Sequence, residues 1–299
     1  MREKRSGAAA GRLRRSRSFL LLAAFSLCLL CLLLAGVVIW ARHLPVFPAR
    51  AGCVAADLPP ADASPAVTAA GLQKPPYPAS HIYQPVYDPA SGERLPVLAL
   101  TFDDGPNSTI TPRLIDALNE RGIHATFFML GRLAERNPEV VAYAYASGHQ
   151  ICSHGWAHEY RLTTLDDAGL AVEVEDTARV IRNITGEDPS YLRPPYGAID
   201  KKTASRIRFP LMLWNIDPRD WDSRDAEKVK QHILDYAFDG GVVLLHDCYE
   251  STLSGAMAAV DELQAAGWQF VTLAEYYDLF DIALQPGVVY RGAGLADID

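Results

Sequence analysis

Short apolar runs alternate with helix-like segments over residues 93–280, and this alternation limits the possible folds more than any other feature. The runs are 96–102, 125–130, 149–153, 191–194, 210–216, 241–246 and 269–273. Segments with a helical pattern lie between most of them, at 112–121, 137–147, 165–185, 224–238 and 253–266. Strands that alternate with helices form parallel sheets with helical crossovers. About seven such units predict an α/β domain, either a barrel or a doubly wound sheet.

The chain upstream of this domain predicts a membrane anchor. Residues 19–41 carry no charge and are almost wholly apolar, and at about 1.5 Å per residue such a helix spans the ~30 Å hydrocarbon core of a bilayer. Residues 1–18 hold seven basic side chains and one acidic side chain, which predicts a cytoplasmic N-terminus and an extracellular remainder. We therefore expect a single-pass protein of the cell membrane. The alternative is secretion after cleavage near 49–51.

The rest of the chain divides by composition. Residues 42–92 are rich in Pro and Ala and show no sustained period, which is typical of a stalk. Residues 93–280 are long enough for one domain with a large core. We interpret 281–299 as a C-terminal tail.

The charge balance excludes one class of partner. The net charge is −8 and the first 18 residues carry +6, so residues 19–299 carry −14. An acidic ectodomain argues against nucleic acids and other polyanions, and it is compatible with a neutral glycan. No obligate protein partner is indicated. Cys53, Cys152 and Cys248 follow the apolar run and match no metal or disulfide framework, so one disulfide among them is left open.

Ionisable residues cluster where the predicted strands end. Five of the seven runs have such groups at their ends, at 103–104, 153–158, 193–197, 215–221 and 245–247. Ligands of α/β folds gather at the carboxyl ends of the strands, so these groups predict an active site. Asp103 and Asp104 precede a Gly-Pro turn that lets two carboxylates approach one point from different directions. A metal-assisted hydrolase uses one such carboxylate on the metal and one to move protons.

His154 and His158 predict the remaining metal ligands. They are four residues apart, a spacing that on a helical turn puts both rings on one face. With Asp104 they form a set of two histidines and one carboxylate, which leaves coordination positions for water and substrate.

Other strand-end residues predict supporting roles. His246 has an unperturbed pKa near neutrality, which suits a general acid. We expect Arg193, next to two prolines, to pair with Asp220 and to orient Asp103. Asp247 is interpreted as a cap or turn residue.

Together these residues form five ordered motifs. They are TFDDGP at 101–106, HGWAH at 154–158, RPPYG at 193–197, DPRDW at 217–221 and LLH at 244–246. Over about residues 95–280 the chain resembles the polysaccharide deacetylase family, the group that shares the NodB homology domain (carbohydrate esterase family 4). The resemblance implies a distorted (β/α) barrel of about seven parallel strands. It also implies metal-dependent removal of N-acetyl groups from polymers that contain GlcNAc, with release of acetate.

The resemblance also implies a role for each site residue. Asp103 would be the general base and His246 the general acid, and Asp104, His154 and His158 would bind the metal. Arg193, held by Asp220, would tether Asp103. The Tyr196 N–H would donate to the oxyanion, and Trp221 and Leu244 would line the pocket for the acetyl methyl group. The expected cofactor is one divalent ion, Zn²⁺, with Co²⁺ or another divalent ion as alternatives. The family usually has Ser or Thr where this chain has Gly155, which puts the affinity and identity of the metal in doubt.

The expected substrate is an acetylated glycan, and the membrane anchor favours peptidoglycan. The alternatives are a deacetylase of chitooligosaccharide, exopolysaccharide or MurNAc, and an O-acetyl esterase of xylan. A non-catalytic wall-binding protein is disfavoured, because binding alone requires neither Asp103 nor His246.

Overall fold

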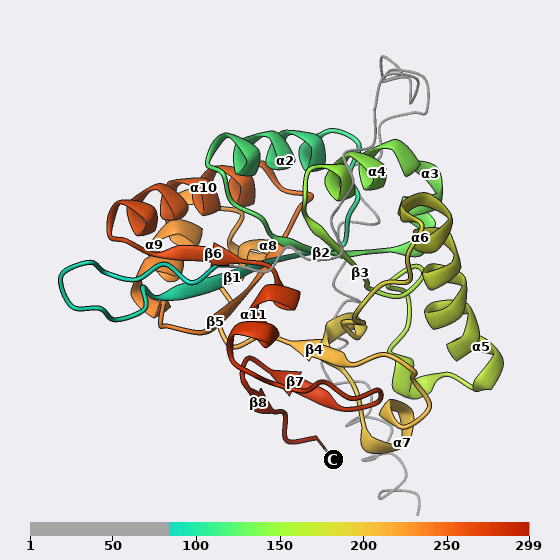
Figure 1. The fold of residues 1–299 in the computed structure, drawn as a ribbon. Helices are drawn as coiled ribbons and strands as arrows, with labels where there is room; N and C mark the ends of the chain where they lie inside the picture. The colour runs from blue at the N-terminus through green and yellow to red at the C-terminus, as the bar shows by residue number, and fades with distance from the viewer. Residues whose placement is uncertain (1–83, 299) are drawn as a thin grey trace, which may run out of the picture. The chain divides into compact units, whose positions relative to one another are not determined.

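The computed structural model describes residues 84–298, which Figure 1 draws as the coloured ribbon. The predicted cytoplasmic segment, the membrane span and most of the stalk lie outside this range, in residues 1–83. Within the described range, no helix combines the length and the apolar composition that a bilayer crossing requires.

A parallel sheet forms the centre of the domain, and β1 (Val97–Asp103) is its middle strand. On one side β1 pairs with β5 (Gly241–His246) from Leu98 to Asp103. On the other side its second half pairs with β2 (Thr126–Met129) and its first half with β6 (Gln269–Val271). β3 (Gln150–Ser153) extends the sheet beyond β2. All these pairings are parallel, as the alternation of strands and helices predicts.

The sheet continues through single-residue bridges into a closed path. Leu192 bridges both Ser153 of β3 and Leu211 of β4 (Leu211–Leu213), and Ile216 bridges Val243 of β5. Since the chain runs directly from β4 to Ile216, the path returns to β5 and β1. β4 also pairs with β7 (Val289–Arg291), which pairs with β8 (Gly294–Leu295). The domain is therefore an α/β fold whose parallel strands close with irregular pairing between β3 and β5.

Helices cover the outside of this closed path. Figure 1 shows α2, α9 and α10 along one side of the sheet and α3 to α6 around the end near β3. The longer helices are α2 (Ile110–Glu120), α4 (Pro138–Ala146), α6 (Thr177–Thr185), α9 (Ala226–Tyr236) and α10 (Glu250–Ala265). The shorter ones are α3 (Gly131–Arg136), α5 (Asp167–Ala171), α7 (Lys201–Ala204), α8 (Asp220–Ser223) and α11 (Leu273–Leu279), with a π-helical turn at Val172–Asp176.

The side chains of β1 alternate between two apolar clusters. Leu98, Leu100 and Phe102 pack with the residues of α2, α4 and α10, whereas Val97 and Ala99 pack in a second cluster on the opposite face. Successive side chains of a strand point to opposite faces. Asp103 therefore shares the face of Val97 and Ala99, which lies on the inside of the closed path, and apolar packing on both faces fixes this register.

The structure differs from two of the sequence predictions. The run 191–194 was predicted as a strand, but it forms only the bridges at Leu192. Pro194 and the proline after it lack the N–H groups that a ladder needs. Within the predicted tail 281–299, β7 pairs with β4 and buries Tyr290 in the core.

Candidate active site

The ends of β1 and β5 place two of the predicted residues side by side. Asp103 and His246 are partners in the register of the two parallel strands, and both lie on the inner face. Asp103 is 2% exposed. Burial raises the pKa of Asp103, and the charge of Arg193 opposes that rise.

Arg193 holds the carboxylate of Asp103. Its Nη1 lies 2.7 Å from Asp103 Oδ1 and donates to Thr101 Oγ1 at 2.8 Å, while its Nε donates to the Met212 carbonyl at 3.2 Å. The guanidinium also lies 4.0 Å from the ring centroid of Phe128. Arg193 is fully buried, so this charge has been removed from water and depends on these partners.

Replacing Arg193 with Ala is expected to lower the free energy of unfolding by about 3–5 kcal/mol, because Asp103 would remain as a buried carboxylate without its countercharge. Urea denaturation followed by circular dichroism measures this change. The exposed pair of Arg113 with Glu250 offers the control, since Arg113→Ala should cost at most about 1 kcal/mol. Equal losses in both variants would contradict the role given to Arg193.

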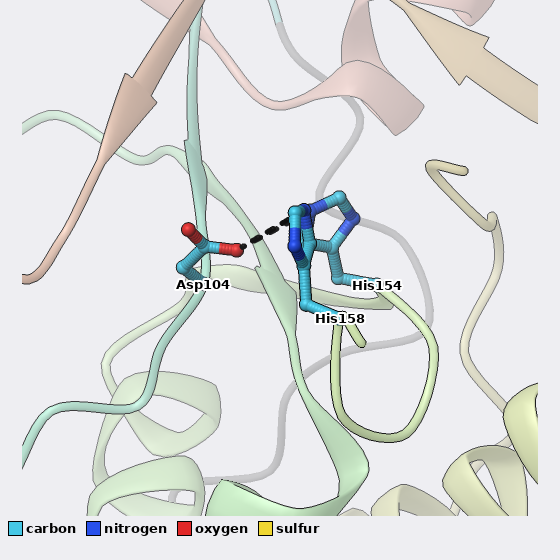
Figure 2. A group of neighbouring side chains, drawn as sticks. All are labelled: Asp104, His154 and His158. Carbon is cyan, nitrogen blue, oxygen red and sulfur yellow. Dashed lines mark ion pairs between the residues drawn. The ribbon is translucent and has the colours of Figure 1, made fainter. Parts of the chain in front are cut away.

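Asp104 lies just beyond β1 with a φ of 73°, and this left-handed backbone turns its carboxylate toward two histidines. Its Oδ1 is 3.5 Å from His154 Nε2 and 3.8 Å from His158 Nε2. Figure 2 shows the carboxylate facing the two rings. One ligand atom from each residue lies within 4.8 Å of the others. Asp104 Oδ1 is buried and has no hydrogen-bond partner. An orphaned carboxylate oxygen facing two imidazoles fits a divalent cation.

A backbone contact sets the tautomer of His154. Its Nδ1 lies 2.8 Å from the Arg193 carbonyl, so Nδ1 carries the proton and Nε2 keeps its lone pair toward Asp104. Burial and the neighbouring His158 lower the pKa of His154 to about 3. The imidazole is therefore neutral, as a metal ligand must be.

The loop between the two histidines is not helical, so the predicted helical turn is wrong. Gly155 has a φ of 81° and His158 a φ of 57°, and no helix is found between 154 and 158. The two rings still converge, with centroids 5.0 Å apart. Two residues in left-handed conformations therefore produce the convergence that the spacing suggested for a different reason.

Asp220 pairs with His246, and the predicted pairing of Asp220 with Arg193 is wrong. Asp220 Oδ1 lies 2.8 Å from His246 Nδ1, and Oδ2 accepts hydrogen bonds from the His246 N–H and the Thr252 hydroxyl. Burial lowers the pKa of His246, but the charge and hydrogen bond of Asp220, together with the charges of Asp104 and Asp103, outweigh burial and raise this pKa to about 10. His246 is thus held as a cation, as a general acid requires.

The remaining predicted residues lie around this cluster. Leu244 is buried on β5, two residues before His246 and on the same inner face. Tyr196 has a φ of 62°, its ring lies 4.2 Å from that of His158, and its hydroxyl donates to the His158 carbonyl. Trp221 is half-buried on α8, next to Asp220.

Three residues that the sequence did not indicate support the site. Thr101 and Thr252 provide hydroxyls to Arg193 and Asp220, and Glu173 accepts from the backbone of the histidine loop. Thr101 sits within the TFDDGP motif and was the only one with a local signal. Glu173 lies within the predicted helical segment 165–185, and Thr252 directly precedes the segment 253–266; neither pattern indicates an inward polar contact.

Known proteins are similar to this chain in sequence. The model of the family described as "Polysaccharide deacetylase" matches residues 91–209. The peptidoglycan-N-acetylglucosamine deacetylase PgdA of Listeria monocytogenes serotype 1/2a is 38% identical over 180 residues, which cover 60% of this chain and 38% of PgdA. A peptidoglycan-N-acetylglucosamine deacetylase of Bacillus cereus is 35% identical over 187 residues, which cover 60% of this chain and 87% of the relative. The chain belongs to the polysaccharide deacetylase family.

The solved structures of this family include a similar fold with a bound metal. A family 4 acetyl xylan esterase from Clostridium thermocellum, in complex with a cobalt ion, matches with a TM-score of 0.63 at 26% identity. The match covers 67% of this chain and the whole of the esterase chain. The chain spans only 38% of the length of the Listeria deacetylase, so membership of the family does not by itself transfer the activity of that whole protein.

Proposed function

We propose that this protein is a metal-dependent deacetylase that removes N-acetyl groups from GlcNAc-type residues of peptidoglycan. The observation that carries the proposal is the cluster of Asp104, His154 and His158 around an orphaned carboxylate oxygen. A carboxylic acid and an imidazole, Asp103 and His246, lie at the ends of the two adjoining strands. The relatives named for peptidoglycan deacetylation support the choice of substrate.

Each step of amide hydrolysis is assigned to a different residue of the chain. Asp104, His154 and His158 would hold the divalent cation, which when bound polarises the acetyl carbonyl and acidifies water. Asp103, held by Arg193, accepts a proton from the attacking water. His246 donates its proton to the departing amine nitrogen, and the Tyr196 N–H donates to the oxygen on which negative charge develops. Water and the amide are consumed, and acetate and a free amine are released.

Asp220→Asn is expected to move the alkaline limb of the pH profile of kcat/KM to lower pH by about 1–3 units. The general acid must be protonated, so activity falls as pH rises through the pKa of His246. Asp220 raises that pKa, and its removal lowers it. Thr252→Val is the control, because it removes one hydrogen bond and keeps the carboxylate. An unchanged alkaline limb in Asp220→Asn would exclude His246 as the acid that this pair supports.

Acetate release from three substrates tests the proposed specificity. Purified protein loaded with Zn²⁺ is expected to release more acetate from peptidoglycan than from chitooligosaccharide or acetylated xylan. The xylan assay addresses the second candidate, an O-acetyl esterase, which the likeness to the Clostridium esterase favours. Mass spectrometry of the treated peptidoglycan distinguishes loss of acetyl from GlcNAc and from MurNAc. Release from xylan alone would overturn the proposal.

The proposal includes a location at the outer surface of the cell membrane. Its support is the uncharged run 19–41 behind a basic segment. Extraction of membranes with alkaline carbonate is expected to leave the protein in the pellet. A soluble protein whose N-terminal sequence begins after residue 49 would favour secretion.

A further inference from the structure

The histidine loop 154–158 is held on one side by the start of α3. The Gly131 N–H donates to the Gly155 carbonyl at 2.9 Å, and the Arg132 N–H donates to the Trp156 carbonyl at 3.0 Å. These bonds use the free N–H groups that every helix presents at its first turn. They fix the carbonyl groups of Gly155 and Trp156, so the N–H groups of the loop bond to other partners.

A buried carboxylate holds the other side of the same loop. Glu173 Oε2 accepts from the Trp156 N–H at 2.5 Å, and the Ala157 N–H also donates to this carboxylate. Glu173 is 5% exposed, and no Lys or Arg forms an ion pair with it among residues 84–298. A carboxylate buried in this way depends on its backbone donors, and here those donors belong to the segment between the two histidines.

The carboxylate of Glu173 occupies the space that a side chain at position 155 would need. A Cβ atom at position 155 would lie 2.6 Å from Glu173 Oε2, and the φ of Gly155 is 81°. Glycine adopts this backbone without strain and leaves room for the carboxylate. Gly155, where the family usually has Ser or Thr, therefore leaves the space that is occupied by Glu173, 18 positions further along the chain.

We propose that Glu173 is a positioning residue for the metal site, whose carboxylate holds the loop 154–158 so that His154 and His158 converge on Asp104. His158 has a left-handed backbone, which persists only where the surroundings fix it. Glu173 and α3 provide that restraint from opposite sides. This inference rests on the proposed function, because it concerns the metal site on which that function depends.

Zinc affinity of the full-length protein tests the inference. Glu173→Ala is expected to weaken Zn²⁺ binding about 10- to 100-fold, as measured by competition with a chromophoric chelator. Glu173→Gln keeps an acceptor oxygen but loses the charge, and its affinity should lie between those of Glu173→Ala and the wild type. Glu175 lies on the same turn, is exposed and pairs with Arg208, so Glu175→Ala should bind zinc as the wild type does.

The outcomes separate this inference from the proposed function. Wild-type affinity in a folded Glu173→Ala variant would overturn the role of Glu173 and leave the proposed function standing, provided that Asp104→Asn loses zinc. A structural role alone would lower the urea midpoint of the zinc-free protein and leave zinc affinity unchanged, which also overturns the inference. If Glu173→Ala does not fold, wild-type zinc affinity in Glu173→Gln would overturn the role of Glu173. Absence of zinc binding in the wild type would overturn both.

Discussion

Asp104→Asn is expected to abolish stoichiometric zinc binding and to reduce acetate release at least about a thousandfold, which corresponds to about 4 kcal/mol of transition-state stabilisation. The carboxylate oxygen of Asp104 faces two imidazole nitrogens and has no other partner. An amide in its place has no negative charge and presents a weaker ligand to a hard or borderline cation. Metal content after dialysis, measured by mass spectrometry, and acetate release report the two effects separately.

Asp247 provides the matched control for this experiment. It is also a buried aspartate beside the site, and burial, opposed by the hydrogen bond from Thr111, raises its pKa to about 7. Its carboxylate packs against Gly105 and is absent from the three-residue cluster. Asp247→Asn should therefore retain zinc. Stoichiometric zinc in Asp104→Asn, or equal loss in both variants, would contradict the assignment of Asp104 as a ligand.

The sequence predicted the end of the sheet at which the site lies, because the carboxyl ends of parallel strands meet at one edge. Asp103 and His246 both end apolar runs of the sequence, and the structure adds that they are register partners on the inner face. The position of Asp104 follows only in part from this rule. The strand has ended there, and the direction of its carboxylate depends on a φ of 73° that the Gly-Pro turn suggested without specifying.

The partner of Asp220 could not be derived in the same way. The sequence predicted that Asp220 pairs with Arg193, because both residues lie at the ends of apolar runs and carry opposite charges. The pairing with His246 depends on α8, which begins at Asp220 directly beside β5, and on the Thr252 hydroxyl at the start of α10. These are contacts between segments distant in sequence, and a single sequence contains no local pattern that reports them.

The histidine loop is a third case. His154 and His158 do converge, as the sequence predicted, but the helical turn on which that prediction was based is absent. The four-residue spacing predicted a helical turn, whereas the loop reaches its shape through Gly155 and the backbone of His158. The restraint that fixes it comes from Glu173, on a segment whose sequence pattern indicates only a helix. Functional loops depart from regular geometry in this way because the surrounding structure compensates for their strain.

Asp103→Asn is expected to keep zinc bound and to lower kcat about 10²- to 10⁴-fold, the range that general base catalysis contributes. Asp103 Oδ2 lies 3.5 Å from His154 Nε2, and its other oxygen is held by Arg193. The asparagine side chain has nearly the same shape, so the site should remain assembled, but its amide cannot accept the proton of the attacking water. Zinc content and single-turnover acetate release, measured on the same sample, test the two halves of this prediction.

The pair of aspartate variants separates binding from chemistry at adjacent positions of one chain. Asp104→Asn should lose both zinc and activity, whereas Asp103→Asn should lose activity alone. Asp247→Asn again serves as the control, since the Asp247 N–H donates to the Asp103 carbonyl at 3.3 Å and the residue lies in the same environment. Undiminished acetate release from Asp103→Asn would mean that another group takes the proton. Loss of zinc from the same variant would mean that both carboxylates serve the metal, and the proposed division of roles between them would be wrong.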